Sequence, residues 1–214
     1  MKTLTQHLAR IAVLMIAPLA LAACGINSIP TKEEKAKAQW AEVQNQYQRR
    51  SDLIPNLVAT VKGYAAQESS VLIGVSEARA GAMQVKSDAS ITTDPAAFQR
   101  YAAAQNSLSV ALAPMRVLQE NYPDLKSNQN FMALQSQLEG TENRITISRR
   151  DYNEAVRDLN TTLRTFPQVF WAKTMYAASK PMELFQATAS AQGAPTVDFA
   201  PAGAAPGAAP PEPK

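Results

Sequence analysis

The feature that most constrains the fold is a long run of apolar residues spaced alternately three and four positions apart. The run lies between residues 127 and 166 and comprises Phe131, Leu134, Leu138, Ile145, Tyr152, Val156, Leu159, Leu163 and Phe166. This spacing places the apolar side chains on one face of an α-helix, with a period close to the seven-residue repeat of coiled coils. At 1.5 Å per residue the helix would be about 60 Å long. A helix of this length predicts an elongated bundle.

Two further segments carry the same spacing. The first begins near Thr31, where the hydroxyl of Thr31 and the carboxylate of Glu34 fit the capping-box pattern of a helix start. Its apolar positions continue to Val75 and run through Pro55. A proline at this place either kinks one helix or separates two, and we favour the kink because the phase continues across it.

The second segment follows a polar loop at residues 87–94. Asp94 and Pro95 form a strong helix start, a capping acid followed by a proline in the first turn. We expect this helix to end near Tyr122, with Pro114 kinking its last turns. A short apolar segment at residues 169–178 predicts one more helix.

These segments together predict the fold class. No stretch alternates as a strand would, so residues 31–186 should form an all-α, elongated antiparallel bundle. Three long helices and a short C-terminal one would make it similar to a four-helix bundle. Residues 187–214 contain ten Ala and six Pro. We expect this tail to be disordered because it cannot bury enough apolar surface to offset its ordering entropy.

The N-terminal residues have the pattern of a bacterial lipoprotein signal. Residues 1–23 combine a positive start with an apolar run of about 13 residues, which is too short to span a membrane. The run ends in Leu-Ala-Ala before Cys24, which resembles the lipobox, whose cysteine is acylated, for example with palmitate, and becomes the first residue. Residues 24–30 would then be a lipidated spacer. The alternative is an ordinary buried cysteine behind an uncleaved anchor.

This pattern predicts a location in the bacterial cell envelope. Two or more acyl chains on Cys24 would hold the protein stably on a membrane, facing the periplasm. Gly25, in place of an aspartate after the cysteine, favours the outer membrane, and the choice of membrane stays open.

Composition excludes several classes of chemistry. The only histidine and the only cysteine are His7 and Cys24, so the processed chain lacks the residues of Ser-His-Asp or Cys-His catalysis, zinc sites and thiol redox chemistry. The eight glycines form no phosphate-binding loop, and no basic run interleaves with aromatics. Loss of Lys2 and Arg10 lowers the basic count from 21 to 19 against 18 acids, a net charge of about +1. We therefore predict no catalytic, cofactor-binding or metal-binding residues and no nucleic-acid partner.

Three functions from different classes stay open. We favour a non-enzymatic, lipid-anchored scaffold or adaptor for envelope partners. A hydrolase acting on an envelope polymer would need paired carboxylates, and Glu33 with Glu34 and Glu139 with Glu142 are the pairs by sequence. Acids on a helix are more often solvated, which weighs against these pairs. A ligand carrier would need a cavity inside the bundle.

Charged residues also lie on the apolar faces. Arg50 falls in the row that Glu68 and Arg79 continue, and Glu142 and Arg149 fall on the face of the third long helix. Either these side chains reach solvent, or acids and arginines of different helices pair in a buried polar layer that fixes the register. For such a layer we expect the first and third long helices to run parallel and Glu142 to supply the acid.

Two long motifs resemble the LemA family. The first runs from Gln46 to Ala65, and the second combines residues 122–127 with residues 131–153. Their polar and turn-forming members are candidates for an interaction or structural motif: Arg50, Asp52, Pro55, Asn56, Glu142, Arg149, Tyr152 and Asn153.

The resemblance covers about residues 26–186 and implies a membrane-anchored helical bundle that faces outward, without an established catalytic activity. It also implies a protein partner in the envelope, such as a membrane protease system. Many members begin with a transmembrane helix ahead of a Tyr-Asn pair. Here Ile26 replaces the tyrosine before Asn27, close behind Cys24, which indicates a lipoprotein-type member.

Overall fold

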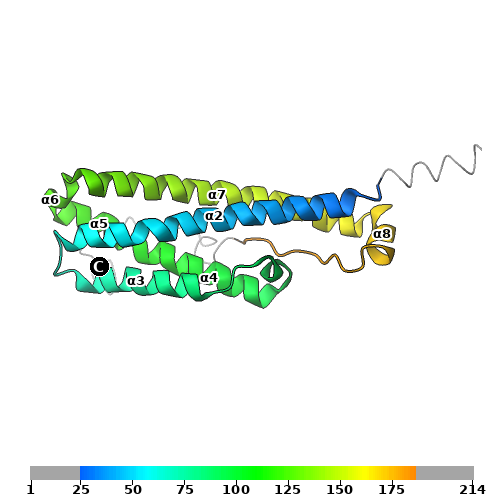
Figure 1. Ribbon diagram of the computed structural model, residues 1–214, viewed down its shortest axis with the longest axis horizontal. Coiled ribbons are helices and arrows are strands. Elements are labelled where there is room, and N and C mark those ends of the chain that lie inside the picture. Colours follow the sequence, from blue (N-terminus) through cyan, green and yellow to red (C-terminus); the bar gives the residue numbers. More distant parts are fainter. Residues whose placement is uncertain (1–24, 187–214) are drawn as a thin grey trace, which may run out of the picture.

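Two long helices set the length of the molecule. In the computed structural model, which describes residues 25–186, α2 spans Ser28–Lys62 and α7 spans Gln129–Arg164 (Figure 1). Each is about 50 Å long at 1.5 Å per residue. The long periodic segment predicted at residues 127–166 is therefore confirmed as one continuous helix.

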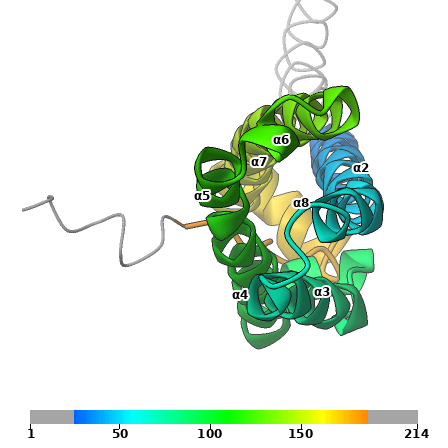
Figure 2. The same ribbon diagram turned by 90° about the vertical axis from the view of Figure 1, so that its left-hand side faces the viewer.

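The other helices complete a four-cornered bundle (Figure 2). They are α3 (Ser69–Gln84), the 3-10 helix η1 (Ala89–Thr93), α4 (Pro95–Leu112), α5 (Pro114–Asn121), α6 (Pro123–Lys126) and α8 (Gln168–Thr174). Viewed end-on, α2, α3, α4 and α7 occupy the corners, and α5 and α6 lead the chain across one end to α7. The part of the chain that the structure describes contains no strand, which confirms an all-α, elongated bundle.

The first long helix is shorter than its apolar pattern predicts. α2 continues through Pro55, but it ends at Lys62, and the chain reverses at residues 63–68 before α3 returns alongside α2. The reversal begins at Gly63, a poor helix former. It brings Leu72 and Val75 into the same core as the end of α2, which one straight helix could not do.

The added reversal also changes the direction of the third long helix. Lys32 on α2 bonds to Thr162 on α7, and Arg50 bonds to Glu142 further along, so residue numbers rise on one helix as they fall on the other. α2 and α7 are therefore antiparallel, and the expectation of a parallel pair is wrong.

One predicted helix start is confirmed, and two other predicted helix boundaries are wrong. Asp94 caps α4 as predicted, accepting hydrogen bonds from the backbone N–H groups of Ala96 and Ala97. The predicted capping box at Thr31 is wrong: α2 already begins at Ser28, and the hydroxyl of Thr31 donates to the carbonyl of Asn27. Pro114 starts the separate helix α5 after a break at Ala113, where a kink within one helix was expected.

The core consists of two apolar clusters arranged along the rod. One surrounds Trp40 and includes Tyr47, Phe98, Tyr101, Ile145, Tyr152, Met182 and Phe185. The other comprises Ile54, Leu57, Val61, Ala65, Leu72, Val75, Ala82, Leu108, Met115, Leu118, Leu125 and Phe131. The first cluster extends from Ile29 to Phe185 in sequence, whereas the second lies entirely within residues 54–131.

The chain after α8 returns along the bundle in an extended conformation (Figure 1). The predicted short helix is confirmed as α8, and residues 177–186, which we call the strap, follow it. The strap contributes Met182 and Phe185 to the cluster around Trp40. It thereby closes the part of the bundle beyond the reach of α3 and α5.

No helix within residues 25–186 is long and apolar enough to cross a membrane. The predicted signal at residues 1–23, the acylated Cys24 and the Ala- and Pro-rich tail at residues 187–214 all lie outside the described residues.

Candidate functional site

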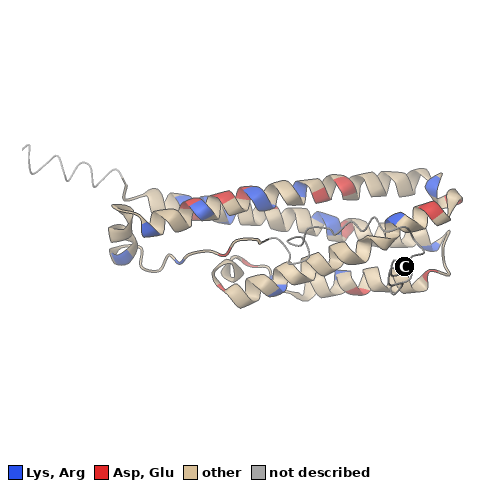
Figure 3. Cartoon of the chain, turned by 180° about the vertical axis from the view of Figure 1, so that it is seen from behind, with Lys and Arg blue, Asp and Glu red and all other residues tan. Residues whose placement is uncertain are grey.

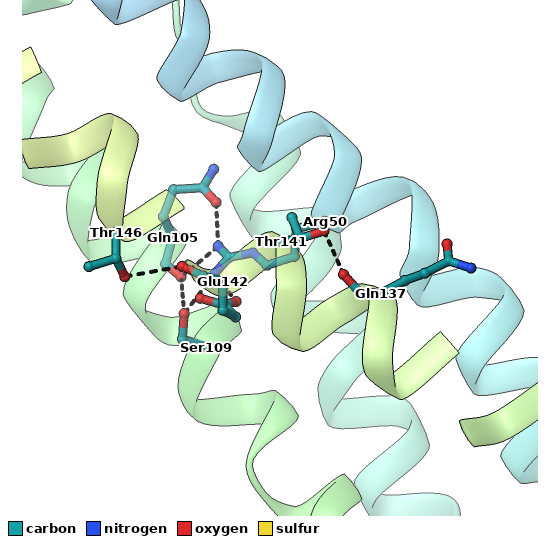
Figure 4. Close-up of polar contacts among 7 residues, drawn as sticks. All are labelled: Arg50, Gln105, Ser109, Gln137, Thr141, Glu142 and Thr146. Carbon is teal, nitrogen blue, oxygen red and sulfur yellow. Dashed lines mark hydrogen bonds and ion pairs between the residues drawn. The ribbon is translucent and has the colours of Figure 1, made fainter. Parts of the chain in front are cut away.

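A polar layer lies between the two apolar clusters, and Arg50 is its centre (Figure 4). The Arg50 side chain is 1% exposed. Its guanidinium donates to Oε1 of Glu142 at 2.8 Å, to Oγ of Ser109 at 2.7 Å, and to both the backbone oxygen and Oε1 of Gln105 at 3.1 and 2.7 Å. Three helices thus converge on one buried cation, as expected for a layer that fixes helix register.

Each member of the layer sits where its helix passes from one cluster to the other. On α2, Arg50 lies between Tyr47 of the first cluster and Ile54 of the second. Its guanidinium also lies over the Tyr47 ring, 5.0 Å from the ring centroid. The structure therefore pairs Arg50 with Glu142, the acid that the sequence singles out for such a layer.

The phenols near the layer are held in their neutral form. Burial raises the pKa of Tyr47, and burial likewise raises the pKa of Tyr101 far above its ordinary range. The positive charges of Arg149 and Arg50 oppose this effect on the pKa of Tyr47 but do not reverse it. Neither phenol is suited to serve as a base near neutral pH.

Arg79 makes a second polar contact between helices, at a backbone carbonyl that Pro55 leaves without its helical partner. A proline inside a helix has no N–H to donate, so the carbonyl four residues earlier loses its helical partner. Here that carbonyl belongs to Ser51, and Nε of Arg79 on α3 donates to it at 2.8 Å. Arg79 therefore satisfies the backbone oxygen that Pro55 leaves free and ties α3 to α2, instead of joining the polar layer.

Three of the motif residues on α7 hold the strap. The side chain of Asn153 makes two bonds of 2.9 Å with the backbone of Phe185, accepting from its N–H and donating to its carbonyl. The hydroxyl of Tyr152 donates to the carbonyl of Glu183 at 2.9 Å. The guanidinium of Arg149 lies over the Phe185 ring, 4.5 Å from its centroid, as in a cation–π contact.

Asn160 also holds the strap, and the sequence pattern did not identify it. It pairs with the backbone of Met182 in the same two-bond manner, at 2.8 and 2.9 Å. Asn160 follows Asn153 by seven residues and so lies on the same side of α7. Two asparagines seven residues apart beside the apolar face of α7 were the sequence feature from which a bound extended segment could have been predicted.

A further contact joins the strap region to the start of α2. Ser179 donates to the carboxylate of Glu33 at 2.6 Å, and Lys37 pairs with the same carboxylate at 2.9 Å. Partial burial works to raise the pKa of Glu33, but these two donors outweigh it and lower the pKa below its ordinary value.

Not every predicted motif residue joins these contacts. Asp52 and Asn56 are exposed on α2, and Asp52 accepts a hydrogen bond from Gln48 on its own helix at 2.7 Å. Glu68 stays outside the layer, since it lies at the start of α3 and accepts from the hydroxyl of Tyr122 at 3.0 Å.

An apolar cleft opens beside the polar layer, where α4 breaks before α5. It holds about 340 Å³ and is lined by Leu57, Ser109, Leu112, Ala113, Met115, Arg116, Phe131, Gln135, Leu138, Glu139 and Glu142. Both members of the predicted carboxylate pair Glu139 and Glu142 reach this cleft. Oε1 of Glu142 already lies 2.8 Å from a guanidinium nitrogen of Arg50, so this carboxylate is engaged in an ion pair at the edge of the cleft. Within residues 25–186 no three His, Cys, Asp or Glu side chains are grouped to hold a metal ion.

These features define a class of protein: a helical bundle with a buried arginine layer, closed by an extended strap that asparagines of its longest helix hold in place. Residues 39–199 match the LemA family, and the chain belongs to that family. The match contains both motifs; it begins after residue 26, where the predicted resemblance starts, and ends at residue 199, beyond the strap. A search of curated proteins finds no match to the chain.

Proposed function

We propose that this protein is a non-enzymatic, lipid-anchored adaptor of the bacterial cell envelope. One observation carries the proposal: the charged and polar family-motif residues that the bundle buries make their bonds within the chain itself. Arg50 with Glu142, and Asn153 with the strap, use their hydrogen-bonding groups to set helix register and close the bundle. Such residues build a rigid rod, which is what an adaptor needs in order to present a surface at a fixed distance from its anchor.

The ends of the rod suit this role. Attachment through Cys24 would place the anchor at the start of α2, one residue before the described chain begins. The opposite end, where α5 and α6 lead into α7, would then lie about 50 Å away. A partner in the envelope, such as a membrane protease system, would meet the rod along its length or at this distal end. Gly25 after the cysteine favours the outer membrane.

The anchor is tested by Cys24→Ser in cells. We expect the variant to keep its signal segment and to incorporate no labelled palmitate, because the thiol is the acylated group. Asn27→Ala is a matched control three residues further on, and it should be processed and labelled like the wild type. Labelling of the Cys24→Ser protein would contradict lipid anchoring.

The adaptor role is tested by crosslinking the intact lipoprotein in whole cells and identifying partners by mass spectrometry. We expect specific envelope proteins that are lost with Cys24→Ser and retained with Asn27→Ala. Recovery of the same set from all three proteins, or of none from the wild type, would contradict the role.

A ligand carrier is the second candidate, and the cleft beside the polar layer favours it. Its volume of about 340 Å³ falls within the range of small-molecule sites, and much of its lining is apolar. Native mass spectrometry of protein purified from envelopes should then show a bound apolar molecule that Leu138→Arg removes. A hydrolase would instead need Glu142 to exchange its Arg50 contact for a reacting substrate.

A further inference from the structure

We propose that the end of the bundle that carries α8 lies against the membrane surface, with the side chains of Phe166, Phe170 and Met175 entering the lipid interface. This inference rests on the proposed anchoring at Cys24 and adds a second membrane contact to it. The occupant of this apolar end is a lipid surface rather than a protein partner.

The apolar residues at this end are unusually exposed. Phe166 is 86% exposed, Phe170 57% and Met175 60%, although each is large and apolar. All three fall within ten residues: Phe166 lies at the turn from α7 into α8, Phe170 within α8 and Met175 just beyond it. Exposed aromatic side chains gathered at one place typically mark an interaction site.

The chain enters the bundle at the same end. A Cβ on Gly25 would lie 3.1 Å from Nε2 of Gln168, the first residue of α8, so the start of the described chain touches this helix. The residue before Gly25 is Cys24, and consecutive Cα atoms are about 3.8 Å apart. α8 and the start of α2 lie at the same end of the bundle (Figure 1). Acyl chains on Cys24 would therefore enter the bilayer beside α8, which would bring the exposed aromatics to the same surface.

The charge of this segment fits an anionic lipid surface. Residues 159–182 contain Arg164, Lys173 and Lys180 and no acid, whereas acids and bases are mixed along α2 and along α7 before residue 159 (Figure 3). All three cations are exposed. Interfacial helices typically insert aromatic side chains into the bilayer, and neighbouring cations on the same helix pair with phosphate headgroups.

Trp171 provides a reporter at this surface. It is half-buried against the core, and its ring centroid lies 5.2 Å from that of Phe170. The other tryptophan, Trp40, is 1% exposed and lies twelve residues after Ser28 on α2, about 18 Å along the helix. Brominated lipid chains quench only nearby indole rings, so they should act on Trp171 and spare Trp40.

The test uses the mature lipoprotein reconstituted in vesicles of phosphatidylethanolamine and phosphatidylglycerol, with and without bromine on the acyl chains. Flotation of the vesicles reports the anchor, and Trp fluorescence reports α8. We expect the protein to float and bromine to quench Trp171, because an interfacial helix buries its apolar face about 5–10 Å deep, at the boundary of headgroups and acyl chains.

A matched pair of double variants identifies the surface. Phe166→Ser with Phe170→Ser should reduce the quenching at least about threefold, because burial of these rings drives insertion. Val110→Ser with Val117→Ser removes apolar residues of similar exposure, 65% and 56%, from α4 and α5, and should leave quenching unchanged.

The outcomes separate the two proposals. A protein that floats without quenching keeps its anchor and overturns the membrane contact of α8. A protein that does not float contradicts the anchor and the contact together. A benzophenone side chain at position 170 in intact envelopes should label lipid. Labelling of protein, whether a second copy or another chain, would overturn the proposal.

Discussion

Removal of the acid from the polar layer should weaken the bundle more than removal of a neighbouring acid. Glu142→Ala takes away the one anionic partner of Arg50 and leaves the guanidinium in place with its charge. Arg50 stays buried, since α4 and α7 still cover it. The charge then has only the neutral oxygens of Gln105 and Ser109 to pair with.

The expected loss of unfolding free energy follows from burial. Leaving a fully buried charge without its partner destabilises proteins by about 3–5 kcal/mol. Here the Glu142 side chain is 37% exposed, so solvent already screens part of the attraction, and three neutral acceptors remain on Arg50. We therefore expect Glu142→Ala to lower the free energy of unfolding by about 2–3 kcal/mol.

Urea unfolding followed by circular dichroism at 222 nm measures this loss. Glu139→Ala removes an exposed acid from the preceding turn of α7 and should change the stability by less than about 0.5 kcal/mol. Arg50→Met combined with Glu142→Ala should be no less stable than Glu142→Ala alone, because the double variant no longer buries a charge. Equal effects of Glu142→Ala and Glu139→Ala would contradict a stabilising ion pair between Glu142 and Arg50 and would show that the Glu142 side chain is solvated.

Contacts outside the polar layer give three further expectations. Arg79→Met should lower the free energy of unfolding, measured in urea, by about 1 kcal/mol. In a Pro55→Ala background the loss should be smaller, because alanine restores the N–H that the Ser51 carbonyl lacks. Equal losses in both backgrounds would contradict the role of Arg79 as the partner of that carbonyl. Asn153→Ala removes two bonds to the strap, so limited proteolysis should cleave residues 177–186 faster, and an unchanged rate would show that these bonds do not hold it. Because the pKa of Glu33 is lowered below its ordinary 4.5, this group stabilises the fold above that pH and loses its effect as pH falls. The melting temperatures of wild type and Glu33→Gln should therefore differ at pH 7 and converge towards pH 3, whereas Glu34→Gln, which is exposed, should follow the wild type at both; a difference that persists at pH 3 would contradict the sign.

Periodicity predicted the regular part of this fold well. The apolar spacing located α7 to within two residues at each end, and the acid–proline start located α4, because both signals act within one or two helical turns. The position of Arg50 on an apolar face also marked it for a polar layer. Glu142 was singled out as the acid of this layer, whereas the neutral partners Gln105 and Ser109 could not be predicted, because the sequence does not give the register of their helix against α2.

The reversal at residues 63–68 and the strap were beyond such reasoning for different physical reasons. Leu72 and Val75 keep the phase of α2, so a helix that folds back on itself and one that continues have the same spacing. The strap shows no apolar periodicity, and its conformation depends on hydrogen bonds from Asn153 and Asn160 on α7. Local sequence cannot report a conformation that distant side chains determine.

The unequal sequence spans of the two core clusters have a consequence for the order in which the two halves fold during synthesis. All members of the second cluster lie within residues 54–131, so that half can assemble as soon as this stretch has been synthesised. The cluster around Trp40 needs Met182 and Phe185, which emerge last. The half that contains the start of α2 is thus the last to complete its core, and until the strap is in place the apolar face around Trp40 stays exposed.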